Sequence, residues 1–357
     1  MIKKIYKIIG LSAALTVSTS LITGCGSENT STPTAPTQQQ SVDDKHAIEF
    51  ADPNVESLVR NILGNLNGEI TSADLSEIKG LCFLGDEGAF ASREPMSEEF
   101  FTQREYEEYW LLYTTSEIAL QSEDVKEEIK AIRSFEDLQY FGNLEYLIID
   151  DVEVKNTGFI QYLPNLKYLD LDVTSKDISE INGCKNLQYL YINCEGAIES
   201  LNFEKLSALK SLCVLDPEMT AIPKVANPED LLYLRIETHQ PIDNSYISEM
   251  PNLKELVLYI GTPSNTDAIG TLKNLKGLII ATPDTNMIDI SSWGNLESLE
   301  TILLGINTDD LSPLLQLNTL QRISFFNYYL DLHPATAEEF NNLAKEFEAK
   351  GIAVKTI

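Results

Sequence analysis

The chain has 357 residues, of which 55 are acidic and 26 basic, and its formal net charge is −29 at pH 7. So acidic a surface repels DNA, RNA and anionic lipid headgroups, which excludes nucleic acid as a partner. The five cysteines form no Cys-x-x-Cys pair and the three histidines lie far apart, so neither a metal nor a cofactor is expected. The acidity is interpreted as an aid to solubility, with attraction of a basic partner as the alternative.

Residues 1–24 are predicted to be an export signal. Three lysines lie within the first seven residues and an apolar run covers 8–21, shorter than the roughly 20 residues that a membrane-spanning helix needs. The following Ile22-Thr23-Gly24-Cys25 resembles the lipobox of bacterial lipoproteins. That resemblance implies cleavage after Gly24 and a diacylglyceryl group on Cys25. It would anchor the chain on the extracellular side of a cell membrane, with a Gram-positive envelope favoured. An ordinary secretory signal is the alternative.

Two further N-terminal segments follow. Residues 25–44 are rich in Ser, Thr, Pro and Gln and are predicted to form a disordered tether. Residues 45–84 are predicted to form a helical N-terminal cap, because Asp52 can accept backbone N–H groups and Pro53 suits the first helical position. One face of that helix would carry Val55, Leu58, Val59 and Ile62.

Residues 85–130 fall outside any repeat and are predicted to be an acidic, aromatic, helical insertion. Its aromatic side chains include Phe101, Tyr109, Trp110 and Tyr113. Insertions in repeat proteins often carry function, but these aromatics could equally pack as a structural flap.

Residues 131–331 repeat one apolar pattern, Leu-x-x-apolar-x-apolar, at intervals of 21 to 24 residues. The pattern begins at Leu144, Leu166, Leu187, Leu209, Leu231, Leu253, Leu275, Leu299 and Leu320. Each unit predicts a short strand with alternate side chains on opposite faces. A single unit cannot bury its leucines, so the units are expected to stack with their strands parallel.

These units resemble the 22-residue leucine-rich repeats of internalin-like bacterial surface proteins, and the segment from Asp52 to Leu75 resembles the cap of that group. The resemblance implies an α/β repeat solenoid. Its parallel sheet would line the concave face of a horseshoe, with short 3₁₀ or extended turns on the convex side. One departure concerns repeat position nine, usually Asn in the family, because only Asn307 keeps that residue here. The bends after the strands must therefore satisfy their backbone groups in another way.

Strand alternation selects the residues that line the concave face, which is where repeat proteins usually bind. One end is predicted to carry tyrosines beside aspartates and the other end apolar side chains, both common at interfaces. Stacked tyrosines that only pack on each other are the alternative. The candidate binding residues are Tyr146, Tyr168, Asp170, Asp172, Tyr189, Tyr191, Tyr233, Arg235, Val257, Tyr259, Ile279, Leu303 and Phe326.

Residues 332–357 are predicted to form a C-terminal cap. Thr336 and Glu339 have the spacing of a capping box, Gly351 can end the helix, and a last strand would follow over 352–357. After Cys25, the remaining cysteines are Cys82, Cys184, Cys194 and Cys213. They are expected to be buried thiols, with one or two disulfides as the alternative.

The sequence contains no nucleophile elbow, phosphate loop, zinc-binding helix or calcium loop, so we do not expect an enzyme. The favoured function is a lipid-anchored surface protein that binds another protein, as in adhesion or recognition. The first alternative is a module that binds a cell-wall or dietary glycan through Tyr168, Tyr189, Asp170 and Asp172. The second is a structural scaffold in an envelope assembly.

Overall fold

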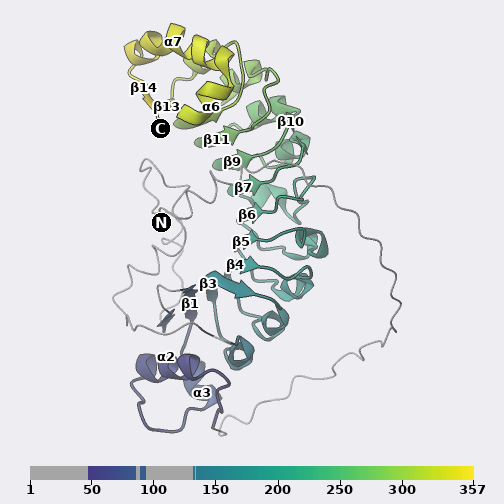
Figure 1. Cartoon of the computed structure of the whole chain (residues 1–357), viewed down its shortest axis with the longest axis vertical. Helices are drawn as coiled ribbons and strands as arrows, with labels where there is room; N and C mark the ends of the chain where they lie inside the picture. The colour runs from purple at the N-terminus through teal and green to yellow at the C-terminus, as the bar shows by residue number, and fades with distance from the viewer. Residues whose placement is uncertain (1–46, 86–88, 94–131, 133) are drawn as a thin grey trace, which may run out of the picture.

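The computed structural model describes residues 47–85, 89–93, 132 and 134–357. The predicted signal, Cys25, the tether and most of the predicted insertion lie outside the described residues. The described part forms a curved solenoid with its strands on the inner side and short helical turns on the outer side (Figure 1). The predicted leucine-rich-repeat horseshoe is confirmed.

One sheet of 12 strands runs through the described residues in the order β14-β13-β12-β11-β9-β7-β6-β5-β4-β3-β1-β2. Its strands are β1 (Gly80–Leu84), β2 (Ala89–Ser92), β3 (Tyr146–Val154), β4 (Tyr168–Val173), β5 (Tyr189–Asn193), β6 (Ser211–Leu215), β7 (Tyr233–Glu237), β9 (Glu255–Tyr259), β11 (Gly277–Ala281), β12 (Thr301–Gly305), β13 (Arg322–Phe325) and β14 (Ala353–Thr356). A second, two-stranded sheet pairs β8 (Ile242–Asp243) with β10 (Pro263–Ser264).

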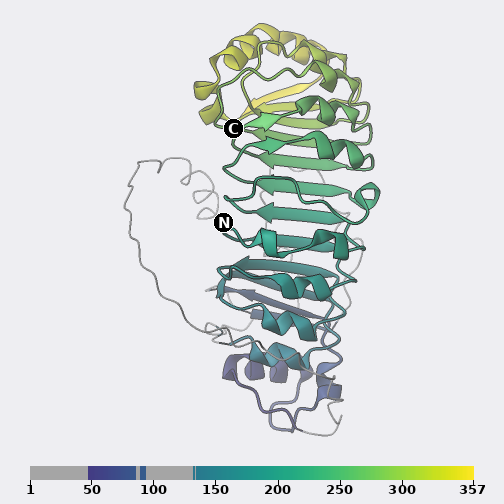
Figure 2. The same ribbon diagram turned by 90° about the vertical axis from the view of Figure 1, so that its right-hand side faces the viewer.

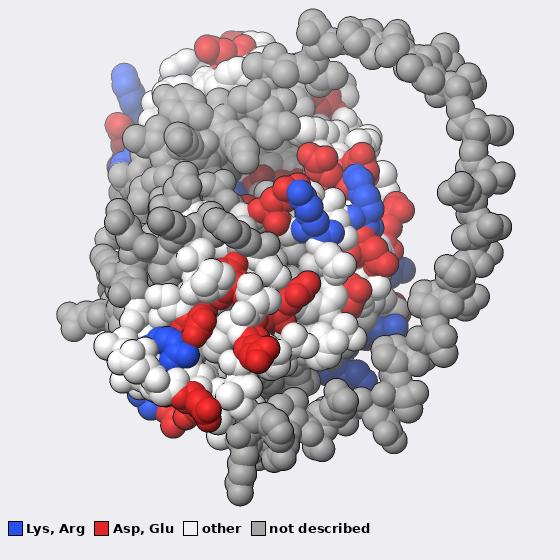
Figure 3. All heavy atoms as spheres, turned by 60° about the horizontal axis from the view of Figure 1, so that its bottom comes forward, with Lys and Arg blue, Asp and Glu red and all other residues white. Residues whose placement is uncertain are grey.

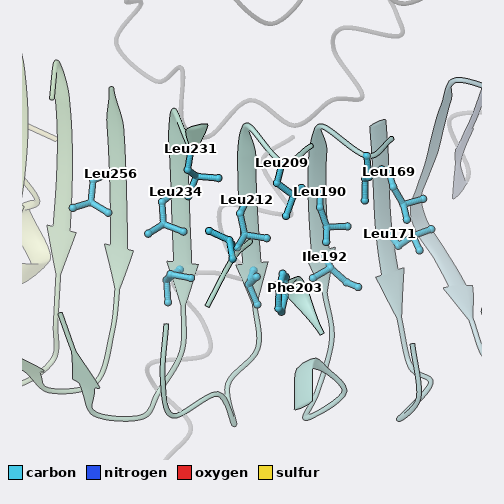
Figure 4. Packing of buried hydrophobic residues seen from close by; sticks show 14 of the residues in the cluster. Leu169, Leu171, Leu190, Ile192, Phe203, Leu209, Leu212, Leu231, Leu234 and Leu256 are labelled. Carbon is cyan, nitrogen blue, oxygen red and sulfur yellow. The ribbon is translucent and has the colours of Figure 1, made fainter. Parts of the chain in front are cut away.

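The register of the parallel strands places equivalent apolar residues side by side. Leu169 pairs with Leu190, which pairs with Leu212, so each apolar position of the repeat becomes a column through the core (Figure 4). The nine leucines that begin the repeats are at most 6% exposed. Because a fully buried Leu contributes about 1.5–3 kcal/mol, these columns supply much of the driving force for stacking.

Short 3₁₀ turns return the chain on the convex side, as predicted, and Figure 2 shows them in front of the strands. They are η3 (Glu136–Tyr140), η4 (Gly158–Tyr162), η5 (Ser179–Gly183), η6 (Ile198–Ser200), η7 (Phe203–Lys205), η8 (Pro228–Asp230), η9 (Ser245–Glu249), η10 (Thr266–Thr271), η11 (Ser291–Asn295) and η12 (Ser312–Gln316). Several begin with an Asp-x-Ser sequence whose carboxylate accepts the serine N–H, at 2.9 Å for Asp177 and 2.8 Å for Asp310.

In some repeats a polar side chain at the preceding residue, repeat position eight, replaces the missing asparagine, whereas other repeats have Val, Cys or Ile there. This position is buried from Val173 to Ile306, and Asp216 and Thr282 there are 0% exposed. The Asp216 carboxylate accepts backbone N–H groups of Gly196, Glu218 and Ile198 at 2.8, 2.9 and 3.3 Å. The backbone N–H of Asp216 donates to Glu237 O of the next repeat at 2.9 Å. The bends thus satisfy their backbone groups with mixed side chains.

The predicted N-terminal cap is present. Helix α2 (Pro53–Leu63) begins after Asp52, whose side chain accepts the Asn54 N–H at 2.9 Å, and α3 (Ser72–Leu75) follows it. Buried Asp137 of the first repeat accepts the N–H groups of Ala51 and Asp52 at 2.7 and 2.8 Å, which ties the cap to the solenoid. Burial raises the pKa of this Asp137 carboxyl, and the two N–H groups oppose the shift.

One boundary of the sequence analysis is wrong. Residues 89–92, assigned there to a helical insertion, form β2, which pairs antiparallel with β1 and places Ala89 opposite Phe83. Ala89 and Ala91 are buried. The segment Ala-Phe-Ala-Ser is too short to show an alternating pattern, so its pairing with β1 defines it as a strand.

The C-terminal cap consists of α6 (Asn327–Leu332), α7 (Pro334–Ala349) and β14. The predicted end of the helix is confirmed, since Gly351 has φ +79° and its N–H donates to Glu348 O. The predicted capping box is wrong. The helix begins at Pro334, and buried Thr336 accepts the Thr308 N–H at 2.8 Å and donates to Ile306 O at 2.8 Å. Thr336 therefore joins the cap to the last repeats.

The four cysteines of the described residues have free thiols. Cys82, Cys184 and Cys194 are buried, as expected, and Cys213 is half-buried. Burial raises the pKa of Cys184 and of Cys194 to about 12, so both remain protonated thiols. Within the part of the chain described here, no helix has the length and apolar content to cross a membrane.

Candidate binding surface

The concave face is built from repeat positions three, five and seven, which alternate with the buried leucine positions along each strand. Parallel register brings equivalent positions of neighbouring strands together. Tyr146, Tyr168 and Tyr189 are thus successive neighbours on β3, β4 and β5, as are Glu237 and Tyr259 on β7 and β9. The side chains of this face are therefore held on a rigid sheet.

The N-terminal end of the face is packed on itself. Tyr168 and Tyr189 stack with ring centroids 6.1 Å apart, and Tyr168 belongs to an apolar cluster with Cys82, Leu84 and Ile148. Tyr168 is 5% exposed. A Cβ on Gly80 would lie 1.6 Å from Cζ of Tyr146, so this ring occupies the space that the glycine leaves. The packing at this end agrees with the alternative interpretation, in which the tyrosines pack on each other.

The carboxylates of this end are also covered. Asp170 is 4% exposed and Asp150 is 7% exposed, while Asp172 is half-buried. Burial raises the pKa of the Cys82 thiol well above its ordinary value, and the negative charges of Asp170 and Asp150 add to the shift. Cys82 is therefore a neutral packing residue beside these acids.

The middle of the face carries an ion pair beside a tyrosine ring. Arg235 Nε donates to Glu237 Oε1 at 2.7 Å, and the Arg235 guanidinium carbon lies 5.9 Å from the ring centroid of Tyr259. Burial alone would lower the pKa of this guanidinium, but the Glu237 carboxylate together with Cys213, Tyr191 and Tyr259 outweighs burial, and the pKa is raised. Arg235 therefore stays charged, in contact with both an anion and an aromatic face.

The C-terminal end is aromatic. Phe326 lies between Tyr259 and Tyr329, with ring centroids 6.3 and 5.6 Å away, and Tyr328 packs edge-on against Tyr329. Tyr328 is 53% exposed. Both tyrosines come from α6, so sequence analysis of the strands missed them; the adjacent pair Tyr328-Tyr329 directly after the last repeat is the signal that could have found them.

Burial divides the predicted site residues into two groups. Side chains that are half-buried are Tyr146, Asp172, Tyr189, Tyr191, Tyr233, Arg235, Tyr259, Leu303 and Phe326. Four are buried, with exposed fractions of 5% for Tyr168, 4% for Asp170, 1% for Val257 and 9% for Ile279. The area available to a partner is thus mainly the central and C-terminal tyrosines with Arg235 and Phe326.

The surface charge agrees with the composition. Figure 3 shows acidic side chains scattered over the N-terminal end, with fewer basic ones between them. Among the described residues, no group of three or more His, Cys, Asp or Glu side chains is arranged to hold a metal ion.

Comparison with known proteins identifies similar solved structures only. No family model and no curated protein matches the chain. A leucine-rich-repeat protein of Leptospira interrogans is 23% identical with a TM-score of 0.41, over 53% of this chain and 56% of that one. An internalin (inlF) of Listeria monocytogenes is 15% identical with a TM-score of 0.41, over 86% and 88%. Internalin C2 of the same organism is 19% identical with a TM-score of 0.40, over 77% and 94%.

The chain thus spans little more than half the length of the Leptospira protein. Because all three TM-scores are below 0.5, the fold assignment depends on the repeats and the sheet of this chain itself.

Proposed function

We propose that this chain is a recognition protein, without enzymatic activity, that binds a protein partner through the centre and C-terminal end of its concave face. One observation supports the proposal most directly. Tyr191, Tyr233, Arg235 and Tyr259 are half-buried side chains on β5, β7 and β9 of a rigid parallel sheet. Phe326 follows β13, and its ring centroid lies 6.3 Å from that of Tyr259. Tyrosine and arginine are the residues that most often dominate binding energy at interfaces, and pre-organisation lowers the entropic cost of binding.

The glycan alternative has less support. Stacking on a sugar requires an exposed aromatic face, and Tyr168 is 5% exposed. Asp170, the acid meant to bond the sugar hydroxyls, is 4% exposed. Of the four residues assigned to that role, only Tyr189 and Asp172 are half-buried.

The test is saturable capture of a partner from cell-surface or host protein extracts by the purified chain. Tyr233→Ala and Phe326→Asp should each weaken capture at least about tenfold, as truncated hot-spot residues do. Tyr162→Ala is the matched control, because Tyr162 is 47% exposed in η4 on the convex side. Equal loss in all three variants, or in none, would contradict a concave site.

We further propose that the chain acts outside the cell, anchored through a diacylglyceryl group on Cys25 as the lipobox resemblance implies. A bacterial host grown with an alkyne analogue of palmitate should label the wild-type chain and not the Cys25→Ser variant. Cys213→Ser should keep the label, because Cys213 lies in β6 of the folded domain. An unlabelled wild-type chain, or a labelled Cys25→Ser variant, would refute the anchor.

A further inference from the structure

Lysines gather along the edge of the sheet at which the strands begin, although the chain carries a net charge of −29. Repeat position two directly precedes each strand, and it is Lys167, Lys210, Lys254 and Lys276 in four of the nine repeats. Two of these lysines form ion pairs with acids at position two of a neighbouring repeat: Lys167 with Glu145 at 2.9 Å, and Lys276 with Glu300 at 3.0 Å. Lys254 lies between those pairs and is exposed. This edge is therefore locally much less negative than the molecule as a whole.

An open trough of about 710 Å³ runs along the same edge, where the strands begin. We call it the rim trough. Its charged and amide lining includes Gln188, Lys210, Glu229, Asp230, Lys254 and Lys276. None of its described lining residues is aromatic. A ligand of the rim trough must therefore be held by charge and hydrogen bonds.

The floor of the rim trough is rigid. Asn252 Nδ2 donates to Glu229 O at 2.9 Å, and Asn274 Nδ2 donates to Pro251 O at 3.0 Å. Each amide thus ties the start of one strand to the preceding repeat, which fixes the spacing of the lysines. Neighbouring strands in a sheet lie about 4.8 Å apart, so Lys254 and Lys276 present ammonium groups to adjacent units of an extended chain.

The mixture of charges selects the chemistry of the ligand. Ammonium groups donate hydrogen bonds to carboxylates, whereas the exposed Glu229 and Asp230 can only accept them when ionised. These two acids would repel a polyphosphate, which brings hydrogen-bond acceptors and negative charge to them. A chain with both carboxylates and hydroxyl groups matches both kinds of residue.

We propose that the rim trough binds an acidic polysaccharide, with Lys254 and Lys276 on its carboxylates and Glu229 and Asp230 on its hydroxyl groups. The rim trough is separate from the concave face. Polysaccharide binding at the rim trough can therefore be tested independently of protein binding at the concave face.

Calorimetric titration of the purified chain with polygalacturonate tests the proposal, with dextran as the neutral probe and polyglutamate as the polyanion without sugar hydroxyls. We expect binding of polygalacturonate alone, weakened by added salt. The double variant Lys254→Ala with Lys276→Ala should bind polygalacturonate about tenfold more weakly. Lys345→Ala is the matched control, an exposed lysine of α7 that should leave binding unchanged.

Glu229→Ala/Asp230→Ala separates the hydroxyl contacts from simple attraction between charges. The proposal predicts weaker binding of polygalacturonate, because the acceptors for its hydroxyls are gone. Tighter binding after removal of the two acids, equal binding of polyglutamate, or no binding of polygalacturonate would each overturn the proposal.

Discussion

At the scale of the residue, Asp216 shows how this solenoid replaces a missing asparagine. The carboxylate is 0% exposed and accepts three backbone N–H groups, and Cys194 Sγ lies 3.4 Å from its Oδ2. A buried carboxylate is tolerated only when hydrogen bonds compensate for its lost hydration. The bend after β5 therefore depends on one side chain from the next repeat.

Asp216→Ala should lower the free energy of unfolding by about 3 kcal/mol, because one buried and two partly buried N–H groups lose their acceptor. Asp310→Ala is the matched control. Among the described residues, its exposed carboxylate accepts the Ser312 N–H alone, and its loss should cost about 1 kcal/mol or less. Denaturant titration of both variants measures the difference, and equal costs would contradict the role of Asp216.

His333 is the second residue whose burial has a measurable consequence. The side chain is 0% exposed, Nε2 donates to Thr282 O at 3.0 Å, and Nδ1 has no hydrogen-bond partner in the described part of the chain. Burial lowers the pKa of this imidazole, although the Thr282 and Gly305 backbones and the Asp284 charge oppose the shift. His333 is therefore neutral in the folded protein and gains a proton more readily when unfolded.

A histidine with a lowered folded pKa contributes stability that is fully present above its unfolded pKa, about 6.5, and is lost as pH falls from there through the folded pKa. Wild-type stability should thus decline between pH 7 and pH 5, and His333→Gln should show a shallower decline. Denaturant unfolding at several pH values measures both slopes. Parallel slopes would show that His333 is not the titrating group.

At the scale of the element, the repeat pattern predicted the strands well and their surroundings less well. Each leucine column was predictable because burial on one face dictates a period of two within a strand. The Asp-x-Ser starts of the turns were also present in the sequence, at Asp177, Asp243, Asp289 and Asp310. Polar side chains that satisfy the bends were expected at repeat position nine, whereas Asp216, Thr238 and Thr282 provide them at position eight.

Burial on the concave face could not be predicted from the repeat. Strand alternation assigns Tyr168, Val257 and Leu303 equally to that face, yet the first two are buried and Leu303 is half-buried. The difference depends on which neighbours reach across each position, and that is a property of the folded molecule. Tyr328 and Tyr329 were missed for the same reason, since α6 brings them to the face.

The close stacking of η10 on η11 gives a direct test at this scale. A Cβ on Gly270 would lie 2.4 Å from Ser292 O, a backbone atom that cannot move alone. Gly270→Ala should therefore destabilise the protein by about 2 kcal/mol through overpacking. Gly183→Ala in η5 is the control, because nothing lies within 4 Å of the added Cβ, and it should be neutral. Thermal unfolding distinguishes them, and a neutral Gly270→Ala would disprove the close contact.

At the scale of the whole molecule, the two caps and the uninterrupted sheet make one long core. Asp137 joins the N-terminal cap to the first repeat, and Thr336 joins the C-terminal cap to the last. Solenoids are stabilised by contacts between neighbouring units, so both caps shield apolar ends that would otherwise meet water. The concave face is the surface that this arrangement holds in a fixed geometry.

The most direct measurement is photo-crosslinking in the native cells, with a photoreactive amino acid placed at Tyr233 on the concave face or at Tyr162 on the convex side. We predict that one protein partner is crosslinked from Tyr233 and that none is crosslinked from Tyr162. The same products from both positions, or products from Tyr162 alone, would contradict recognition through the concave face.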